Sequence, residues 1–82
     1  MTHETARAIN SPLARRIVGY AEQCHEHPLA LEEIGKMGEH IGPQGLELAL
    51  HELESLHLAD RCWSCNCLIT RANPHRGWCP HG

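Results

Sequence analysis

The sequence lacks phenylalanine, and its only aromatic side chains are Tyr20, Trp63 and Trp78. A core must therefore be built mostly from leucine, isoleucine, valine and alanine, which favours helices packed against helices. No apolar run approaches the roughly 20 residues that span a bilayer, and the first residues lack the apolar centre of a signal peptide. We therefore expect a cytoplasmic protein with no membrane contact.

Complete disulfide pairing is excluded, because the chain holds five cysteines, an odd number. Thiols also stay reduced in the cytoplasm. A chain of 82 residues makes one domain, whose core leaves little margin of stability, and domains of this size often add a metal ion or a disulfide. The composition therefore favours a bound metal over disulfides.

Acidic residues are absent from the C-terminal part of the chain. Residues 1–60 hold ten acids and four bases, a net charge of −6, whereas residues 61–82 hold three arginines and no acid, a net charge of +3. The two parts add up to the net charge of −3 of the whole chain. This dipolar pattern differs from the uniformly basic surface expected of a strong DNA-binding protein.

Three helices are predicted. Ser11 and Pro12 form a helix start, as an N-cap followed by a first-turn proline, and this helix should end near His25. A second, short helix is expected over residues 29–37. A third should begin at Gly42-Pro43, after a turn in which Ile41 is expected to enter the core. The apolar stripe of this third helix is the strongest periodic signal in the chain, and it comprises Leu46, Ala49, Leu50, Leu53 and Leu56.

The periodicity changes after the third helix. Residues 58–63 and 68–70 are compatible with two short strands around a turn at 64–66. We therefore expect a single domain, mainly α with a small β-hairpin. Its parts should be a flexible arm over residues 1–10, a helix-turn-helix core over 11–61, and a wing with a metal knuckle over 62–82.

The run LALEEIGKMGEHIGPQGLELALHELESLHLADRC carries a resemblance to winged helix-turn-helix domains, which extends over residues 12–71. With the cysteines included, the chain distantly resembles FeoC-like regulators of bacterial ferrous-iron transport and winged-helix proteins with a rubredoxin-like zinc ribbon. The spacing C-x2-C-x-C-x11-C differs from the FeoC-like pattern. Gly82 stands where the last cysteine of a ribbon would fall.

The C-terminal stretch carries the candidate metal ligands. Cys62 and Cys65 can bind one ion together, because the turn between them can present backbone amides to the sulfurs. Cys79 is the expected third ligand. We prefer His81 as the fourth, which gives a closed site of three thiolates and one imidazole, a set typical of structural Zn²⁺. Cys67 competes for this position, and the sixth candidate, His75, is the least favoured.

An iron–sulfur cluster is the alternative cofactor, because such clusters also take four thiolate ligands. A cluster would recruit Cys67 and leave His81 free. It would also give the purified protein a brown colour, whereas a zinc protein is colourless.

The sequence indicates the function of the protein less directly than it indicates a metal site. The winged-helix resemblance implies that the third helix reads DNA, but this helix carries three glutamates and no lysine or arginine, and such cations supply most non-specific DNA affinity. We therefore expect this chain to bind another protein, as a regulator, an adaptor or an inhibitor from a phage or mobile element. A DNA-binding transcriptional regulator is the alternative, an iron–sulfur sensor of the FeoC type is the lesser one, and no motif indicates an enzyme. Candidate contact residues for either partner are Arg15, Arg16, Gln44, Glu47, His51, Arg61, Arg71 and Arg76.

Overall fold

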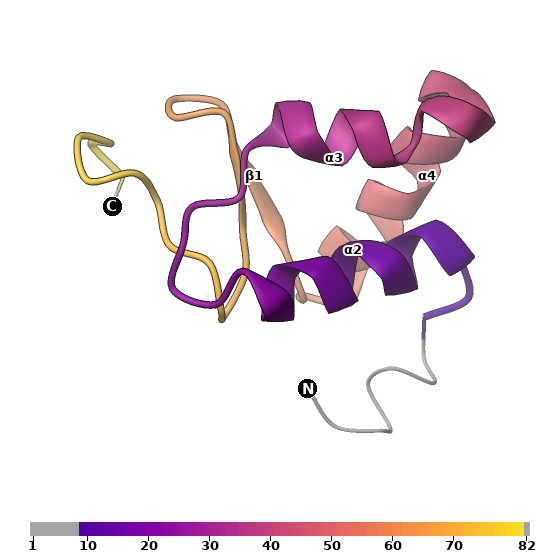
Figure 1. Cartoon of the computed structure of the whole chain (residues 1–82), viewed down its shortest axis with the longest axis horizontal. Coiled ribbons are helices and arrows are strands. Elements are labelled where there is room, and N and C mark those ends of the chain that lie inside the picture. The colour runs from indigo at the N-terminus through magenta and orange to yellow at the C-terminus, as the bar shows by residue number, and fades with distance from the viewer. Residues whose placement is uncertain (1–8, 82) are drawn as a thin grey trace.

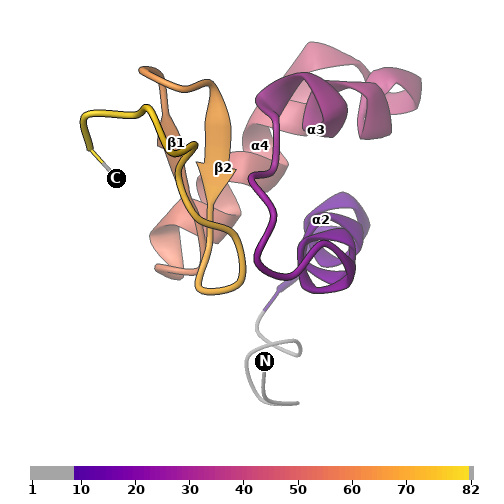
Figure 2. The ribbon, with the colours of Figure 1, turned by 60° about the vertical axis from the view of Figure 1, so that its left-hand side comes forward.

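The computed structural model describes residues 9–81. The elements, in chain order, are α2 (Pro12–Gln23), α3 (Leu31–Met37), the 3-10 helix η1 (Glu39–Ile41), α4 (Gly42–Ser55), β1 (Asp60–Cys62) and β2 (Cys67–Ile69). Figures 1 and 2 show the antiparallel hairpin and the C-terminal loop at one end of the three helices. The predicted class, mainly α with a small hairpin, is confirmed at this level.

Helix α2 begins where the sequence predicts. The Ser11 side chain caps it by accepting a hydrogen bond from the Ala14 N–H at 3.2 Å, and the first-turn proline fits a position that needs no N–H donor. Its buried face, formed by Leu13, Ala14, Ile17 and Ala21, packs against α3 and α4.

Helix α3 begins at Leu31, two residues later than expected. The Leu29 carbonyl accepts from the Leu68 N–H at 2.7 Å, and the Leu31 N–H donates to the Asn66 carbonyl at 2.8 Å. Ala30 thereby forms an antiparallel bridge with Cys67. Strand β2 is thus hydrogen-bonded on both sides, to β1 and to the segment that leads into α3, and this fixes the hairpin to the helices.

Helix α4 follows its predicted stripe, with Ala49, Leu50 and Leu53 buried, while Leu56 at its end is 36% exposed. The prediction that Ile41 enters the core is wrong, because its side chain is 45% exposed. Ile41 instead lies against the first turn of α4. A Cβ atom at Gly45 would stand 2.7 Å from Ile41 Cδ1, so the glycine leaves the space that this side chain occupies.

The expected flexible arm does not extend to residues 9 and 10. Ile9 is only 1% exposed and belongs to the core. The Asn10 and Ser11 N–H groups each donate to the Glu52 carboxylate at 2.9 Å, which joins the start of α2 to α4. The rest of the predicted arm, residues 1–8, lies outside the described residues.

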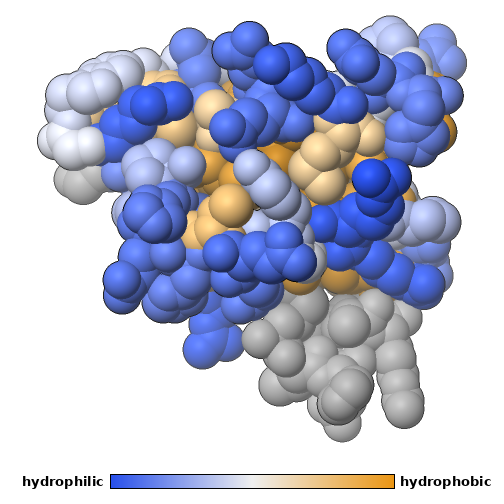
Figure 3. All heavy atoms as spheres, viewed as in Figure 1, coloured by the Kyte–Doolittle hydropathy of each residue, from blue (hydrophilic) through white to orange (hydrophobic). Residues whose placement is uncertain are grey.

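The surface of the face in Figure 3 is mostly hydrophilic, with apolar side chains visible between the hydrophilic rows in its middle. Among the described residues, no helix has the length and apolar character required to cross a membrane.

Candidate metal centre

Four side chains converge beside the hairpin. The sulfurs of Cys62, Cys65 and Cys79 and a ring nitrogen of His75 all lie within 4.8 Å of one another. Cys62 Sγ is 3.6 Å from Cys79 Sγ, and His75 Nδ1 is 3.5 Å from Cys79 Sγ and 3.8 Å from Cys65 Sγ. All these cysteines are free thiols.

The three distances of 3.5–3.8 Å are close to the edges of a coordination tetrahedron. With Zn–S bonds of about 2.3 Å and a Zn–N bond of about 2.0–2.1 Å, tetrahedral angles place two sulfurs about 3.8 Å apart and a sulfur and a nitrogen about 3.6 Å apart. Three thiols and one imidazole are also donors that zinc prefers. The residues present therefore fit a tetrahedral metal ion.

The local fold explains how the first two cysteines meet. Cys62 ends β1 and lies opposite Cys67 at the start of β2, so the tight connection between the strands carries Cys65. Asn66 within this connection has a φ of +53°, a left-handed conformation that asparagine adopts more readily than most residues. The turn also directs the N–H groups of Ser64 and Cys65 at the Cys62 sulfur, as expected from the sequence, and the donor from Cys65 is the main reason that the pKa of Cys62 is lowered.

The other two thiols receive backbone donors from the C-terminal loop. Burial opposes ionisation of Cys65, but the Arg76 N–H and the neighbouring thiols donate to its sulfur and together lower the pKa of Cys65 to about 7. Burial raises the pKa of Cys79, and the His81 N–H, which donates to the Cys79 sulfur, opposes this shift. Each of the three thiols therefore has a backbone N–H donor that would also stabilise a metal-bound thiolate.

Cys67, the predicted competitor, stands outside the group of four. Its side chain is fully buried, and its thiol donates to the Cys65 carbonyl at 3.4 Å. Burial raises the pKa of the Cys67 thiol, as it does that of Cys79, so it is the position of Cys67 and not its acidity that separates it from the group of four.

His75 occupies the position for which the sequence favoured His81. His81 is exposed and contributes its backbone N–H to Cys79, while its ring is not part of the group. Spacing along the chain misled the prediction, because a residue two positions after Cys79 reaches that sulfur more easily with its backbone than with its ring. The expected trio of Cys62, Cys65 and Cys79 is brought together by the structure.

Asn73 is the residue that places His75, and sequence reasoning missed it. Its side chain is 1% exposed, and its amide nitrogen donates to the carbonyls of Ala21, Cys24 and His27 at 3.0–3.2 Å. These carbonyls lie at and beyond the C-terminal end of α2. Thr70 closes the same turn, since its hydroxyl donates to Asn73 Oδ1 at 2.6 Å. The loop is therefore docked on α2 two residues before His75.

Several predicted contact residues are used inside the molecule. Arg61 donates to Glu54 at 2.6 Å and to Glu47 at 2.7 Å, and His51 also lies 3.3 Å from Glu47. Arg76 donates its side-chain N–H to the Cys65 carbonyl at 3.3 Å. Arg15 is at an exposed position, but it donates its Nε–H to the Ile9 carbonyl at 2.8 Å. The remaining candidates lie at exposed positions, and they are Arg16, Gln44 and Arg71.

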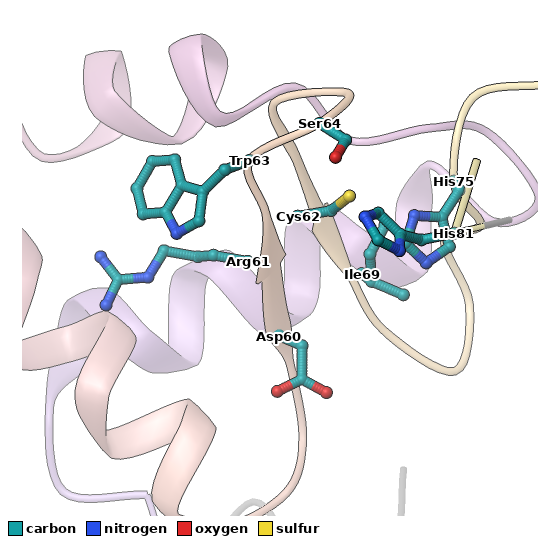
Figure 4. Close-up of a pocket in the computed structure, with 8 residues that line it drawn as sticks. All are labelled: Asp60, Arg61, Cys62, Trp63, Ser64, Ile69, His75 and His81. Carbon is teal, nitrogen blue, oxygen red and sulfur yellow. The ribbon is translucent and has the colours of Figure 1, made fainter. Parts of the chain in front are cut away.

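A cavity of about 360 Å³ adjoins the candidate metal centre on the hairpin. Trp63 and Arg61 border one side of it, and the rings of His75 and His81 border the other (Figure 4). His81 is therefore close to the centre without being one of its four converging side chains.

Comparison of the chain with protein-family models, curated proteins and solved structures found no match.

Proposed function

We propose that this protein is a small zinc-stabilised winged-helix module that acts by binding another protein. The observation that carries the zinc assignment is the convergence of three thiols and His75 Nδ1 at distances close to tetrahedral edges. A site with four protein ligands has no open position, and such closed zinc sites are structural rather than catalytic. The metal would therefore hold the hairpin and the C-terminal loop together.

The donor set supports zinc over an iron–sulfur cluster. A cluster with four thiolates would need Cys67, which instead donates to the Cys65 carbonyl. We expect purified protein to contain one zinc per chain and to be colourless. Iron and sulfide in stoichiometric amounts, with visible absorbance, would overturn this assignment.

The winged-helix interpretation is supported by the order of the elements, three helices followed by an antiparallel hairpin. The bridge between Ala30 and Cys67 also joins the hairpin to the segment before the second of these helices. In this interpretation α4 corresponds to the third helix, which reads DNA in many proteins of this class.

The charges around α4 support a protein partner. Glu52 is bound to N–H groups at the start of α2, and Glu47 and Glu54 are paired with Arg61. Arg61, which contacts α4 through these pairs, is therefore already neutralised. Helix α4 itself carries no lysine or arginine that could bind phosphate, and these cations supply most non-specific DNA affinity.

DNA is the second candidate partner, because the exposed side of α4 presents polar groups suited to base contacts. Gln44 and His51 are both exposed, and the ion pairs with Arg61 reduce the repulsion between α4 and phosphate. This observation is weaker than the lack of cations on the same helix.

A salt titration with labelled random duplex DNA distinguishes the two partners. We expect the zinc-loaded protein to show no submicromolar binding at low salt. Submicromolar binding that weakens steeply as salt rises would indicate phosphate contacts and would overturn the proposal in favour of a DNA-binding regulator.

A further inference from the structure

The outward ridge of α4 is formed by Gln44, Leu48, His51 and Ser55, which are all exposed. Their spacing places them on one face, opposite the buried positions Ala49, Leu50 and Leu53. Leu48 lies in the middle of this ridge and is 71% exposed, the most exposed of the large apolar side chains in the described part of the chain. An apolar side chain in this position adds nothing to the core.

A second exposed apolar side chain is held next to α4 by Arg61. Trp63 is 69% exposed, and the Arg61 guanidinium carbon lies 5.5 Å from the centroid of its ring. Arg61 is itself fixed to α4 by Glu47 and Glu54 at 2.7 and 2.6 Å. Figure 4 shows the indole and the guanidinium on the same side of β1.

We define the α4–Trp63 surface as Trp63, Arg61, Glu47 and Glu54, which are joined by these contacts, together with Leu48, which follows Glu47 on the exposed side of α4. Tryptophan and arginine are over-represented among side chains that dominate binding energy at protein interfaces. Arg61 is only 12% exposed and is held by two carboxylates, so docking against it would lose little side-chain entropy. The surface combines two exposed apolar side chains, Leu48 and Trp63, with an arginine that is already held in place, Arg61.

The charge of this surface indicates the chemistry of its partner. Two carboxylates and one guanidinium leave an excess of one negative charge, and Glu47 is 49% exposed. The neighbouring Asp60 is also exposed and adds a further negative charge. Basic groups on a partner would be attracted to this surface and acidic groups repelled.

We propose that the α4–Trp63 surface docks a segment of another protein that carries an aliphatic or aromatic anchor flanked by lysine or arginine. This inference rests on the proposed function, since it names the surface and the kind of partner through which a protein-binding module would act. Trp78 supplies a matched control. It is 67% exposed, and the ring that Arg61 contacts is that of Trp63.

Selection of a random peptide library against the zinc-loaded full chain tests the inference. We expect enriched peptides to contain an apolar anchor beside basic residues. Leu48→Ala and Trp63→Ala should each weaken the binding of an enriched peptide at least about tenfold, while Trp78→Ala changes it less than about twofold. Leu48→Lys should weaken it further, because it adds a cation that faces the basic flank. Zinc content and circular dichroism establish that each variant is folded.

The outcomes separate the surface from the broader proposal. Enriched peptides that bind with the same affinity to Leu48→Ala and Trp63→Ala as to the natural sequence would overturn the surface and leave a protein-binding function standing. If no peptide is enriched beyond a control selection without the protein, both the surface and the protein-binding function are overturned. Sedimentation that shows a dimer abolished by Leu48→Ala would assign the surface to a second copy of the chain and overturn the heterologous partner.

Discussion

His75 and His81 lie on the same C-terminal loop, but only the ring of His75 approaches two cysteine sulfurs. We predict that His75→Ala lowers zinc affinity by more than about 100-fold, because it removes one of four ligands and leaves a site that water must complete. His81→Ala should change the affinity less than about threefold, because its contribution to the Cys79 sulfur comes from the backbone. Competition with a chromophoric chelator measures both affinities. An equal loss in the two variants would contradict the assignment of His75.

Asn73 fixes the loop that carries His75, and the two hydrogens of its amide nitrogen are shared among three carbonyls near the end of α2. We predict that Asn73→Ala lowers the free energy of unfolding of the zinc-loaded protein by about 1–3 kcal/mol, since the buried bond to Ala21 and the part-buried bonds to Cys24 and His27 are lost. Asn73→Asp should be at least as harmful, because a carboxylate cannot donate to the same carbonyls. Chemical denaturation measures both changes, and Arg71→Ala at an exposed position of the same turn is the control. A loss no larger than that of the control would contradict the role of Asn73.

Three of the four converging side chains could be predicted from the sequence, and the fourth could not. Cys62 and Cys65 are paired by a local turn, and Cys79 is the one cysteine that follows the hairpin. The choice between His75 and His81 depends on how the loop docks, and the docking depends on Asn73 reaching carbonyls some 50 positions earlier in the chain. The dipeptide Asn73-Pro74 indicates a turn in the sequence, but it does not identify these acceptors.

At the level of the elements, the start of α2 depends on α4. The Asn10 and Ser11 N–H groups donate to Glu52, and these bonds lower the pKa of its carboxyl below the usual value. A lowered pKa in the folded state means that the stabilisation is present above the pKa of the unfolded chain. It is lost as the pH falls through the pKa of the folded protein.

We therefore predict that Glu52→Gln lowers the thermal midpoint at neutral pH and that this difference from the natural sequence shrinks as the pH falls below the range in which Glu52 ionises. Thermal melts of both proteins at a series of pH values measure the difference. Glu39→Gln, at an exposed carboxylate of η1, controls for general loss of negative charge. A difference that stays constant from neutral to acidic pH would show that the charge of Glu52 does not act in this way.

Helix periodicity and the hairpin could be predicted because they are local, whereas the pairing of the segment before α3 with β2 could not. The apolar stripe of α4 and the cap of α2 follow from a few adjacent residues each. By contrast, residues 29–30 were predicted as helix but lie extended, because they form hydrogen bonds with β2 nearly forty positions later. Ile41 was misplaced for a related reason, since its position depends on the space above Gly45.

On the scale of the whole molecule, the ion pairs of Arg61 join the basic C-terminal part to the acidic helical part. The separation of charge seen in the sequence is therefore reduced at the contact between the two parts. Of the three arginines in this C-terminal part, Arg71 is the one at an exposed position.

Metal removal should destabilise more than the hairpin. The strands have three residues each, and the loop after them is fixed to α2 by Asn73. Structural zinc contributes apparent binding energies of about 10–16 kcal/mol in small domains. We predict that a strong chelator unfolds residues 58–82 and lowers the thermal midpoint of the helices, which can be followed by NMR and circular dichroism. An unchanged thermal transition after verified zinc removal would contradict this prediction.

The central claim, a zinc ion held by three thiolates and His75, is tested most directly by X-ray absorption at the zinc edge of the zinc-loaded protein. We predict three sulfur neighbours at about 2.3 Å and one nitrogen neighbour at about 2.0–2.1 Å. The scattering pattern of the imidazole ring should be lost in His75→Ala. Four sulfur neighbours, which would require Cys67, or an imidazole pattern unchanged in His75→Ala, would contradict the claim.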